Sequence, residues 1–157
     1  MTRAEPRSGA ERKTDTLAKL QARGIDVWVA SASLSSHDLA RAHLVPLSLA
    51  WIDERIVIAL ESNSRTARNI IKHGVARLAL GPTRDVVIID TDLDQTINLD
   101  DAPATLAERY ADQADWDPRT AGGHYVFLVL RPERIQAWRE ANELAGRTLM
   151  RAGSWVL

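Results

Sequence analysis

The short connections between apolar runs constrain the fold of this chain more than any other feature. Residues 43–51 and 56–60 both have the composition of β-strands, and Asp53-Glu54-Arg55 makes a tight connection between them. A parallel crossover needs about a dozen residues or more, so a loop this short leaves only the antiparallel arrangement. The two runs are therefore predicted to be antiparallel neighbours.

The same pattern continues along the chain. Further strands are predicted over residues 25–32, 75–80, 86–90, 95–99, 124–130 and, after a break at Arg131-Pro132, 135–138. Polar turns are predicted over 33–41 and 92–94, and short helices over 14–23, 64–73 and 101–113. This order does not alternate strand with helix as a doubly wound fold does. We expect a mainly β fold with flanking helices, an antiparallel barrel of six or seven strands.

Composition sets the size of the fold and excludes several kinds of site. The chain has 157 residues, close to the size of one domain, and 45% of them are hydrophobic. We expect a disordered N-terminal tail over residues 1–13 and a single domain over 14–157. The chain has no cysteine, which excludes disulfides, thiolate metal sites and a cysteine nucleophile.

Charge and hydropathy bear on partners and location. The net charge of -1 implies no strongly basic surface, so nucleic acid is not an expected partner. No apolar run approaches the roughly 18 residues that a membrane helix needs. Residues 1–13 are polar and lack the apolar region of a secretory signal. The sequence predicts a cytoplasmic protein that does not associate with membranes.

Residues 61–72 carry the strongest functional signal. Ser64 stands where a helix N-cap belongs, and the first turn of such a helix presents free N–H groups that favour phosphate. The segment adds cations on one helical face and hydroxyl donors, namely Arg65, Arg68, Lys72, Ser62 and Thr66. The pattern predicts a phosphate-binding helix, and the alternative is a solvated basic stripe opposite an apolar one.

Three segments, in this order, resemble the flavin-binding core of the pyridoxamine 5'-phosphate oxidase-like split barrels. They are residues 43–48 (His-Leu-Val-Pro-Leu-Ser), 64–69 (Ser-Arg-Thr-Ala-Arg-Asn) and 75–81 (Val-Ala-Arg-Leu-Ala-Leu-Gly). Weaker similarity follows at residues 83–87 and 146–151. Together these segments span most of residues 26–157.

The resemblance implies a split-barrel homodimer with its cofactor at the subunit interface. The cofactor would be FMN or, alternatively, the deazaflavin coenzyme F-420. Its ring would lie along the strand that contains Val45, Pro46, Leu47 and Ser48. Its phosphate would be held by Ser62, Ser64, Arg65, Thr66 and Arg68. The implied function is hydride transfer between the cofactor and a small organic substrate.

The chain also departs from the true pyridoxamine 5'-phosphate oxidases. Those enzymes carry a lysine where Thr66 stands, and Arg147 and Arg151 match their C-terminal signature only loosely. The sequence is more similar to the actinobacterial group that uses FMN or the deazaflavin. A non-catalytic flavin- or haem-binding module on the same barrel is the alternative function.

Other residue patterns add little. The histidines have no metal-ligand spacing and residues 90–101 lack the glycine and glutamate of a calcium loop, so no metal site is predicted. His43 is either a contact of the cofactor or substrate or an ordinary strand-surface residue. Trp116 either stacks on a bound ring or packs under its own loop. The sequence assigns no catalytic side chain.

Overall fold

The computed structural model describes residues 4–157. Its strands are β1 (Asp26–Leu34), β2 (Ala40–Ser48), β3 (Ala50–Ile52), β4 (Arg55–Glu61), β5 (Val75–Leu80), β6 (Val86–Asn98), β7 (Tyr125–Trp138), β8 (Thr148–Arg151) and β9 (Ser154–Trp155). Its helices are α1 (Gly9–Gln21), α2 (Arg65–His73) and α3 (Ala104–Ala114), with short 3-10 turns η1 (Leu99–Asp101), η2 (Pro118–Thr120) and η3 (Ala141–Glu143).

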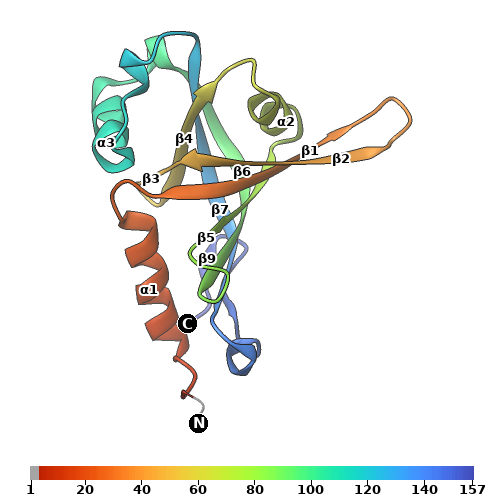
Figure 1. The fold of residues 1–157 in the computed structure, drawn as a ribbon, viewed down its shortest axis with the longest axis vertical. Coiled ribbons are helices and arrows are strands. Elements are labelled where there is room, and N and C mark those ends of the chain that lie inside the picture. The colour runs from red at the N-terminus through yellow and green to blue at the C-terminus, as the bar shows by residue number, and fades with distance from the viewer. Residues whose placement is uncertain (1–3) are drawn as a thin grey trace.

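The strands form one antiparallel sheet that bends back on itself as a split barrel. Their order is β2-β1-β5-β6-β7-β4-β3, and β8 and β9 extend the sheet from β7. β2 contacts β4 although the two strands are not hydrogen-bonded neighbours. Helices α2 and α3 lie at one end of the strands and α1 lies beside the other end (Figure 1). The prediction of a mainly β antiparallel barrel is confirmed, with seven strands on the main path and two short strands added.

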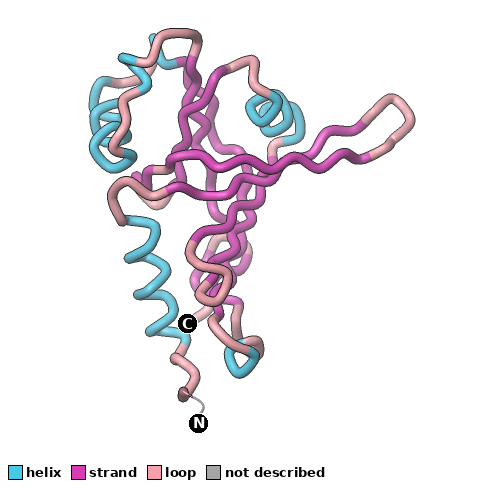
Figure 2. Tube along the Cα trace, in the orientation of Figure 1, coloured by secondary structure: helices cyan, strands magenta, loops and turns pink. Residues whose placement is uncertain are grey.

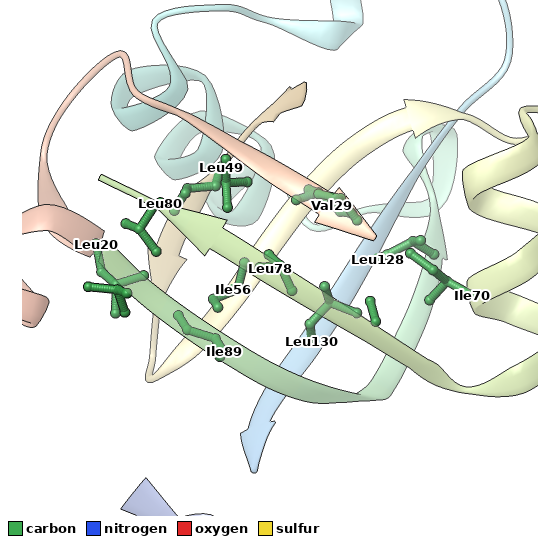
Figure 3. Close-up of a cluster of buried hydrophobic side chains, with 14 of the residues drawn as sticks. Leu20, Val29, Leu49, Ile56, Ile70, Leu78, Leu80, Ile89, Leu128 and Leu130 are labelled. Atoms are coloured by element: carbon green, nitrogen blue, oxygen red, sulfur yellow. The ribbon is translucent and has the colours of Figure 1, made fainter. Parts of the chain in front are cut away.

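Burial explains why some strands alternate and others do not. In β1 the buried residues Val27, Val29 and Ser31 alternate with more exposed ones, because one face points into the barrel. In β4 residues 56–60 are all buried, because α3 covers the face that points away from the barrel interior. Figure 3 shows the interior cluster, with Leu20, Val29, Leu49, Ile56, Ile70, Leu78, Leu80, Ile89, Leu128 and Leu130 labelled.

Two interruptions that the sequence predicted between strands are β-bulges inside long strands, so both of these predictions are wrong. The pairs Leu93–Leu130 and Gln95–Val129 leave Asp94 without an opposite residue, so the turn expected over 92–94 is part of β6. The extra residue on β7 is Glu133, and the strand continues through the expected break at Arg131-Pro132. Each bulge absorbs one residue while the ladder resumes beyond it.

The remaining differences are at element ends. The expected strand over 43–51 is divided at Leu49 into β2 and β3. β1 and β2 pair as far as Leu34 and Ala40, so the expected turn over 33–41 shrinks to residues 35–39. The C-terminal segment, for which no strands were predicted beyond residue 138, contains β8 and β9.

Helix α1 begins earlier than predicted. It starts at Gly9 instead of Thr14, because Ser8 accepts a hydrogen bond from the Glu11 backbone and the Glu11 side chain accepts one from the Ser8 backbone. The expected disordered tail over residues 1–13 is therefore wrong for residues 9–13, which are helical. Residues 1–3 lie outside the described part of the chain.

A partly buried ionic cluster fastens the start of α1 to the barrel. The Arg7 guanidinium lies 2.8 Å from Glu143 of η3, 2.8 Å from Asp15 and 3.4 Å from Asp85 of the β5–β6 turn. Glu143 also accepts hydrogen bonds from the backbone N–H groups of Arg7 and Arg139. Side-chain hydrogen bonds from Arg7 hold the pKa of Glu143 down to about 2. These contacts connect three segments that are distant in the sequence.

The β1–β2 hairpin projects from the barrel as an arm (Figure 2). β5 pairs with β1 only over Trp28 to Ala30, so among residues 4–157 the outer part of β1 has no strand partner on that side. Cross-strand pairs place apolar residues together on one side, which we call the hairpin face: Trp28, Ala30, Ala32, Leu34, Ala40, Ala42, Leu44 and Pro46. Trp28 is 51% exposed, Leu34 51% and Leu44 58%. Apolar exposure on this scale is typical of an interaction surface.

Candidate functional site

The N-terminus of α2 has the structure that an anion site requires. Ser64 is the N-cap, with φ -63° and ψ 154°, and its hydroxyl accepts a hydrogen bond from the Ala67 N–H at 3.2 Å. Ala67 and Ile70 anchor the helix in the barrel interior, and Gly74 ends it at φ 74°, a left-handed conformation that glycine adopts without strain. The free N–H groups and the positive end of the helix dipole therefore stand at a fixed place.

β2 lies beside this helix terminus. His43, Val45 and Leu47 are half-buried and alternate with the exposed residues Leu44 and Pro46. A hydrogen bond of 3.1 Å from Asn69 of α2 to the Ser31 hydroxyl connects the helix to β1, and Ser31 pairs directly with His43 of β2. The helix and the hairpin are thus joined through buried polar side chains.

A cavity of about 530 Å³ brings these elements together. Its walls are built from β2, from the segment between the end of β4 and the start of α2, and from two aromatic residues further along the chain. The lining residues are Asp26, His43, Val45, Pro46, Leu47, Ser48, Ala59, Leu60, Glu61, Ser64, Arg65, Thr66, Trp116 and Tyr125. Its size and mixed lining are typical of a small-molecule or cofactor site.

The charges around the cavity favour an anion at one end. Within residues 4–157 the Arg65 guanidinium has no carboxylate within 4.0 Å, whereas Arg77 and Arg109 are paired with Asp90 and Asp53. A free guanidinium beside a helix N-terminus is a strong binder of phosphate oxygens. The carboxylate of Asp26 accepts a hydrogen bond from the Ser48 hydroxyl at 3.2 Å. The cavity therefore has a cationic end at α2.

Tyr110 of α3 hydrogen-bonds to the backbone of two residues that line the cavity, and these two residues form what we call the cavity floor. Its hydroxyl donates to the carbonyl of Ser48 and accepts from the N–H of Ala59, both at 3.3 Å, and both of these residues line the cavity. Burial raises the pKa of the Tyr110 hydroxyl to about 12, so the hydroxyl keeps the proton that it donates. One side chain thus holds β2 and β4 together where they do not pair.

Removing this hydroxyl is expected to destabilise the fold. Tyr110→Phe leaves the Ala59 N–H and the Ser48 carbonyl without this partner, which costs about 1–3 kcal/mol in the free energy of unfolding. Urea unfolding checks the value. Tyr125→Phe is the matched control, because the Tyr125 hydroxyl has no side-chain hydrogen bond among residues 4–157 and its loss should change little. Equal stabilities for the two variants would contradict the role of Tyr110.

The structure brings most of the predicted binding residues into one cavity. Those that line it are Val45, Pro46, Leu47, Ser48, Ser64, Arg65 and Thr66. Ser62 lines a separate pocket beside η1, and Arg68 is exposed on α2 and does not line the cavity. His43 and Trp116, for which the sequence left two interpretations each, both line it.

Sequence reasoning missed several lining residues. They are Asp26, Ala59, Leu60, Glu61 and Tyr125. Glu61 is adjacent to the serine-rich segment in the sequence and offered a signal by that position. The others have no local motif, because they meet the cavity only through the pairing of β1 with β2 and of β4 with β7.

Two absences among the described residues limit the kinds of site that this part of the chain can form. Within residues 4–157 no three His, Asp or Glu side chains gather in a way that could hold a metal ion. None of the helices in the described chain combines the length and apolarity needed to cross a bilayer.

Comparison with known proteins identifies the fold. No family model matches the chain, and no curated protein matches it. An "F420 Reductase" structure is 13% identical with a TM-score of 0.54, over 75% of this chain and 94% of that one. A putative pyridoxamine 5'-phosphate oxidase from Listeria innocua is 13% identical with a TM-score of 0.55, over 82% and 98%. A heme binding protein from Mycobacterium smegmatis is 17% identical with a TM-score of 0.56, over 98% and 60%. At these identities the likeness is one of fold.

Proposed function

We propose that this chain, which has the split-barrel fold of the pyridoxamine 5'-phosphate oxidase-like proteins, binds FMN or the deazaflavin coenzyme F-420 and acts as an oxidoreductase. The observation that carries the proposal is the cavity, in which the free Arg65 and the N-terminus of α2 meet the β2 strand. A phosphate at one end and a ring along a strand are the needs of a flavin nucleotide. The named F420 reductase and oxidase neighbours support the same class of cofactor.

The residues present fit such a cofactor. Ser64, Arg65 and Thr66 would hold the phosphate, because they supply hydroxyl and guanidinium donors beside free backbone N–H groups. The segment from Val45 to Ser48 would lie along the ring. Ser62 and Arg68, which do not line the cavity, would assist the phosphate site from further away.

The chemistry follows from this division of roles. A bound flavin or deazaflavin supplies hydride transfer to or from a small organic substrate. The chain orients the ring against β2, neutralises the phosphate with Arg65 and excludes water with Leu47, Leu60 and Trp116. No side chain is assigned as a catalytic acid or base.

The homodimer expected from the sequence is part of the proposal. The hairpin face is apolar and exposed, and its member Pro46 also lines the cavity. A second copy seated on the hairpin face would therefore border the cavity and exclude water from it. This arrangement supports a cofactor site shared between two subunits.

Arg65→Ala tests the cofactor site. We expect the dissociation constant of FMN to rise about 10- to 100-fold, since a charge-assisted hydrogen bond contributes about 1.5–3 kcal/mol. Riboflavin, which lacks the phosphate, should bind wild type and variant equally. Titration followed by cofactor fluorescence, repeated with the deazaflavin, gives the constants and identifies the cofactor.

Two controls make this test specific. Arg109→Ala removes an exposed arginine that pairs with Asp53 away from the cavity, and it should leave FMN affinity unchanged. Arg68→Ala should have a smaller effect than Arg65→Ala. FMN binding that is indifferent to Arg65, or no binding of either cofactor by wild type, would refute the assignment of the site.

A non-catalytic flavin- or haem-binding module is the second candidate. It is favoured by two observations, the likeness of fold to a heme binding protein and the position of His43 on the cavity wall, from which its imidazole would ligate haem iron. A haem absorbance band that is lost in His43→Ala would support this candidate. A change in flavin absorbance coupled to turnover of a substrate would support the oxidoreductase instead.

A further inference from the structure

We infer that Trp116 and Tyr125 form an aromatic corner that selects a planar conjugated substrate. This inference rests on the proposed cofactor site. Trp116 follows α3, where Asp115 at φ 55° turns the chain out of the helix. Tyr125 is the first residue of β7. The two residues come from different elements and line the same cavity as the proposed ring-binding strand.

The geometry of the two rings defines what they can bind. Their centroids are 5.5 Å apart and their planes meet at 64°. Rings at this distance and angle stand edge to face, and because both residues line the cavity, the ring surfaces not used in their mutual contact border one space. A planar conjugated molecule can contact one ring by stacking and the other edge-to-face, and both arrangements are favourable for aromatic pairs. A saturated ring of the same size offers neither contact.

The corner is held in place by other aromatic residues. The centroids of the Trp116 and Tyr110 rings are 6.5 Å apart and their planes meet at 76°. The centroids of the Tyr110 and Phe127 rings are 5.3 Å apart and their planes meet at 66°. Because the Tyr110 hydroxyl is fixed to Ser48 and Ala59, this row of rings is anchored to the cavity floor. Trp116 is nevertheless 36% exposed, so packing within the chain leaves part of the indole free to contact a ligand.

A carboxylate borders the corner and narrows the substrate class. The side chains of Glu61 and Tyr125 both border Gly123. A Cβ atom added to Gly123 would lie 3.4 Å from Glu61 Oε1 and 3.8 Å from Tyr125 Cε2. Glu61 lines the cavity, and no group among residues 4–157 donates a hydrogen bond to its side chain. A carboxylate accepts hydrogen bonds, so the substrate ring should carry a donor such as a hydroxyl or amino group.

Two matched probes test the inference, 2-naphthol and decahydro-2-naphthol. Both carry a hydroxyl on a fused two-ring skeleton, but only the first is planar and conjugated. Calorimetric titrations would use the 157-residue chain saturated with FMN or the deazaflavin, whichever binds. We expect wild type to bind 2-naphthol about tenfold more tightly than decahydro-2-naphthol. Trp116→Ala should abolish this preference, and Trp116→Phe should retain most of it.

The outcomes separate the two proposals. Trp155→Ala is the control, since Trp155 lies in β9 and outside the cavity, and it should keep the preference. Cofactor binding without a preference for 2-naphthol, or with a preference indifferent to Trp116, would overturn the aromatic corner alone. Failure of wild type to bind either cofactor would overturn the proposed function and, with it, this inference. Unchanged thermal unfolding of the variants excludes a folding defect as the cause.

Discussion

Replacing Trp28 and Leu44 together by glutamate is expected to prevent formation of the proposed homodimer and leave the protein monomeric. Both residues lie on the hairpin face, where they are more than half exposed in the single chain. A dimer that covers this face would bury four added carboxylates without partners, two from each copy. Even a discounted penalty of about 1–2 kcal/mol for each would weaken association roughly 1000-fold or more.

Analytical ultracentrifugation over a range of concentrations measures the effect. Arg77→Glu and Arg109→Glu make a matched double control, because these arginines are exposed but do not belong to the hairpin face. The glutamate variant should also bind FMN more weakly, since Pro46 connects the hairpin face to the cavity. A wild-type protein that is monomeric at high concentration would contradict the dimer, whatever its cofactor affinity.

Glu143→Gln is expected to lower the free energy of unfolding by about 3 kcal/mol at pH 7. Glu143 is 4% exposed and accepts hydrogen bonds from the Arg7 side chain and from two backbone N–H groups. Neutralising Glu143 is costly because the Arg7 charge stays largely buried with only Asp15 and Asp85 left beside it, and because the Glu143 carboxylate loses its charge-assisted hydrogen bonds. Glu133→Gln, in the surface pair with Arg131, is the control and should cost less than about 1 kcal/mol.

The pH dependence of this difference has a definite sign. The pKa of Glu143 is lowered to about 2 in the folded chain, against about 4.3 in an unfolded one. The ion pair therefore contributes its full stabilisation above about pH 4.3, and that contribution is lost as the pH falls towards 2. Urea unfolding at several pH values should find wild type and Glu143→Gln converging at the acid end. A difference that stays constant down to pH 2 would show that the charge is not its source.

The sequence predicted elements well where local signals and burial agree. β5 was predicted with its observed bounds, because residues 75–80 alternate and lie between Gly74 and Gly81. The start of α2 was placed correctly within one residue from Ser64 alone. The start of α1 was not predicted although its signal is present: Ser8 and Glu11 form a capping box, whereas the polar composition of residues 1–13 predicted a tail.

The parts that sequence could not supply depend on long-range pairing. The bulges at Asp94 and Glu133 have the polar, charged composition of turns, and only the β6–β7 register distinguishes the two. The same applies to the cavity. Ser64 and Arg65 were identifiable from their place at a helix start, but Asp26 and Tyr125 reach the cavity only because β1 and β7 are where the sheet puts them.

The place of β7 in the sheet also governs how the chain can fold during synthesis. β4 is complete at Glu61, yet β7, which pairs with it along most of its length, begins only at Tyr125. Until the ribosome has delivered that strand, the apolar residues of β4 have an unpaired edge and no closed barrel around them. The nascent chain is therefore open to misassociation from the completion of β4 until β7 has been made, and barrel closure should follow release of residues 125–138 from the ribosome.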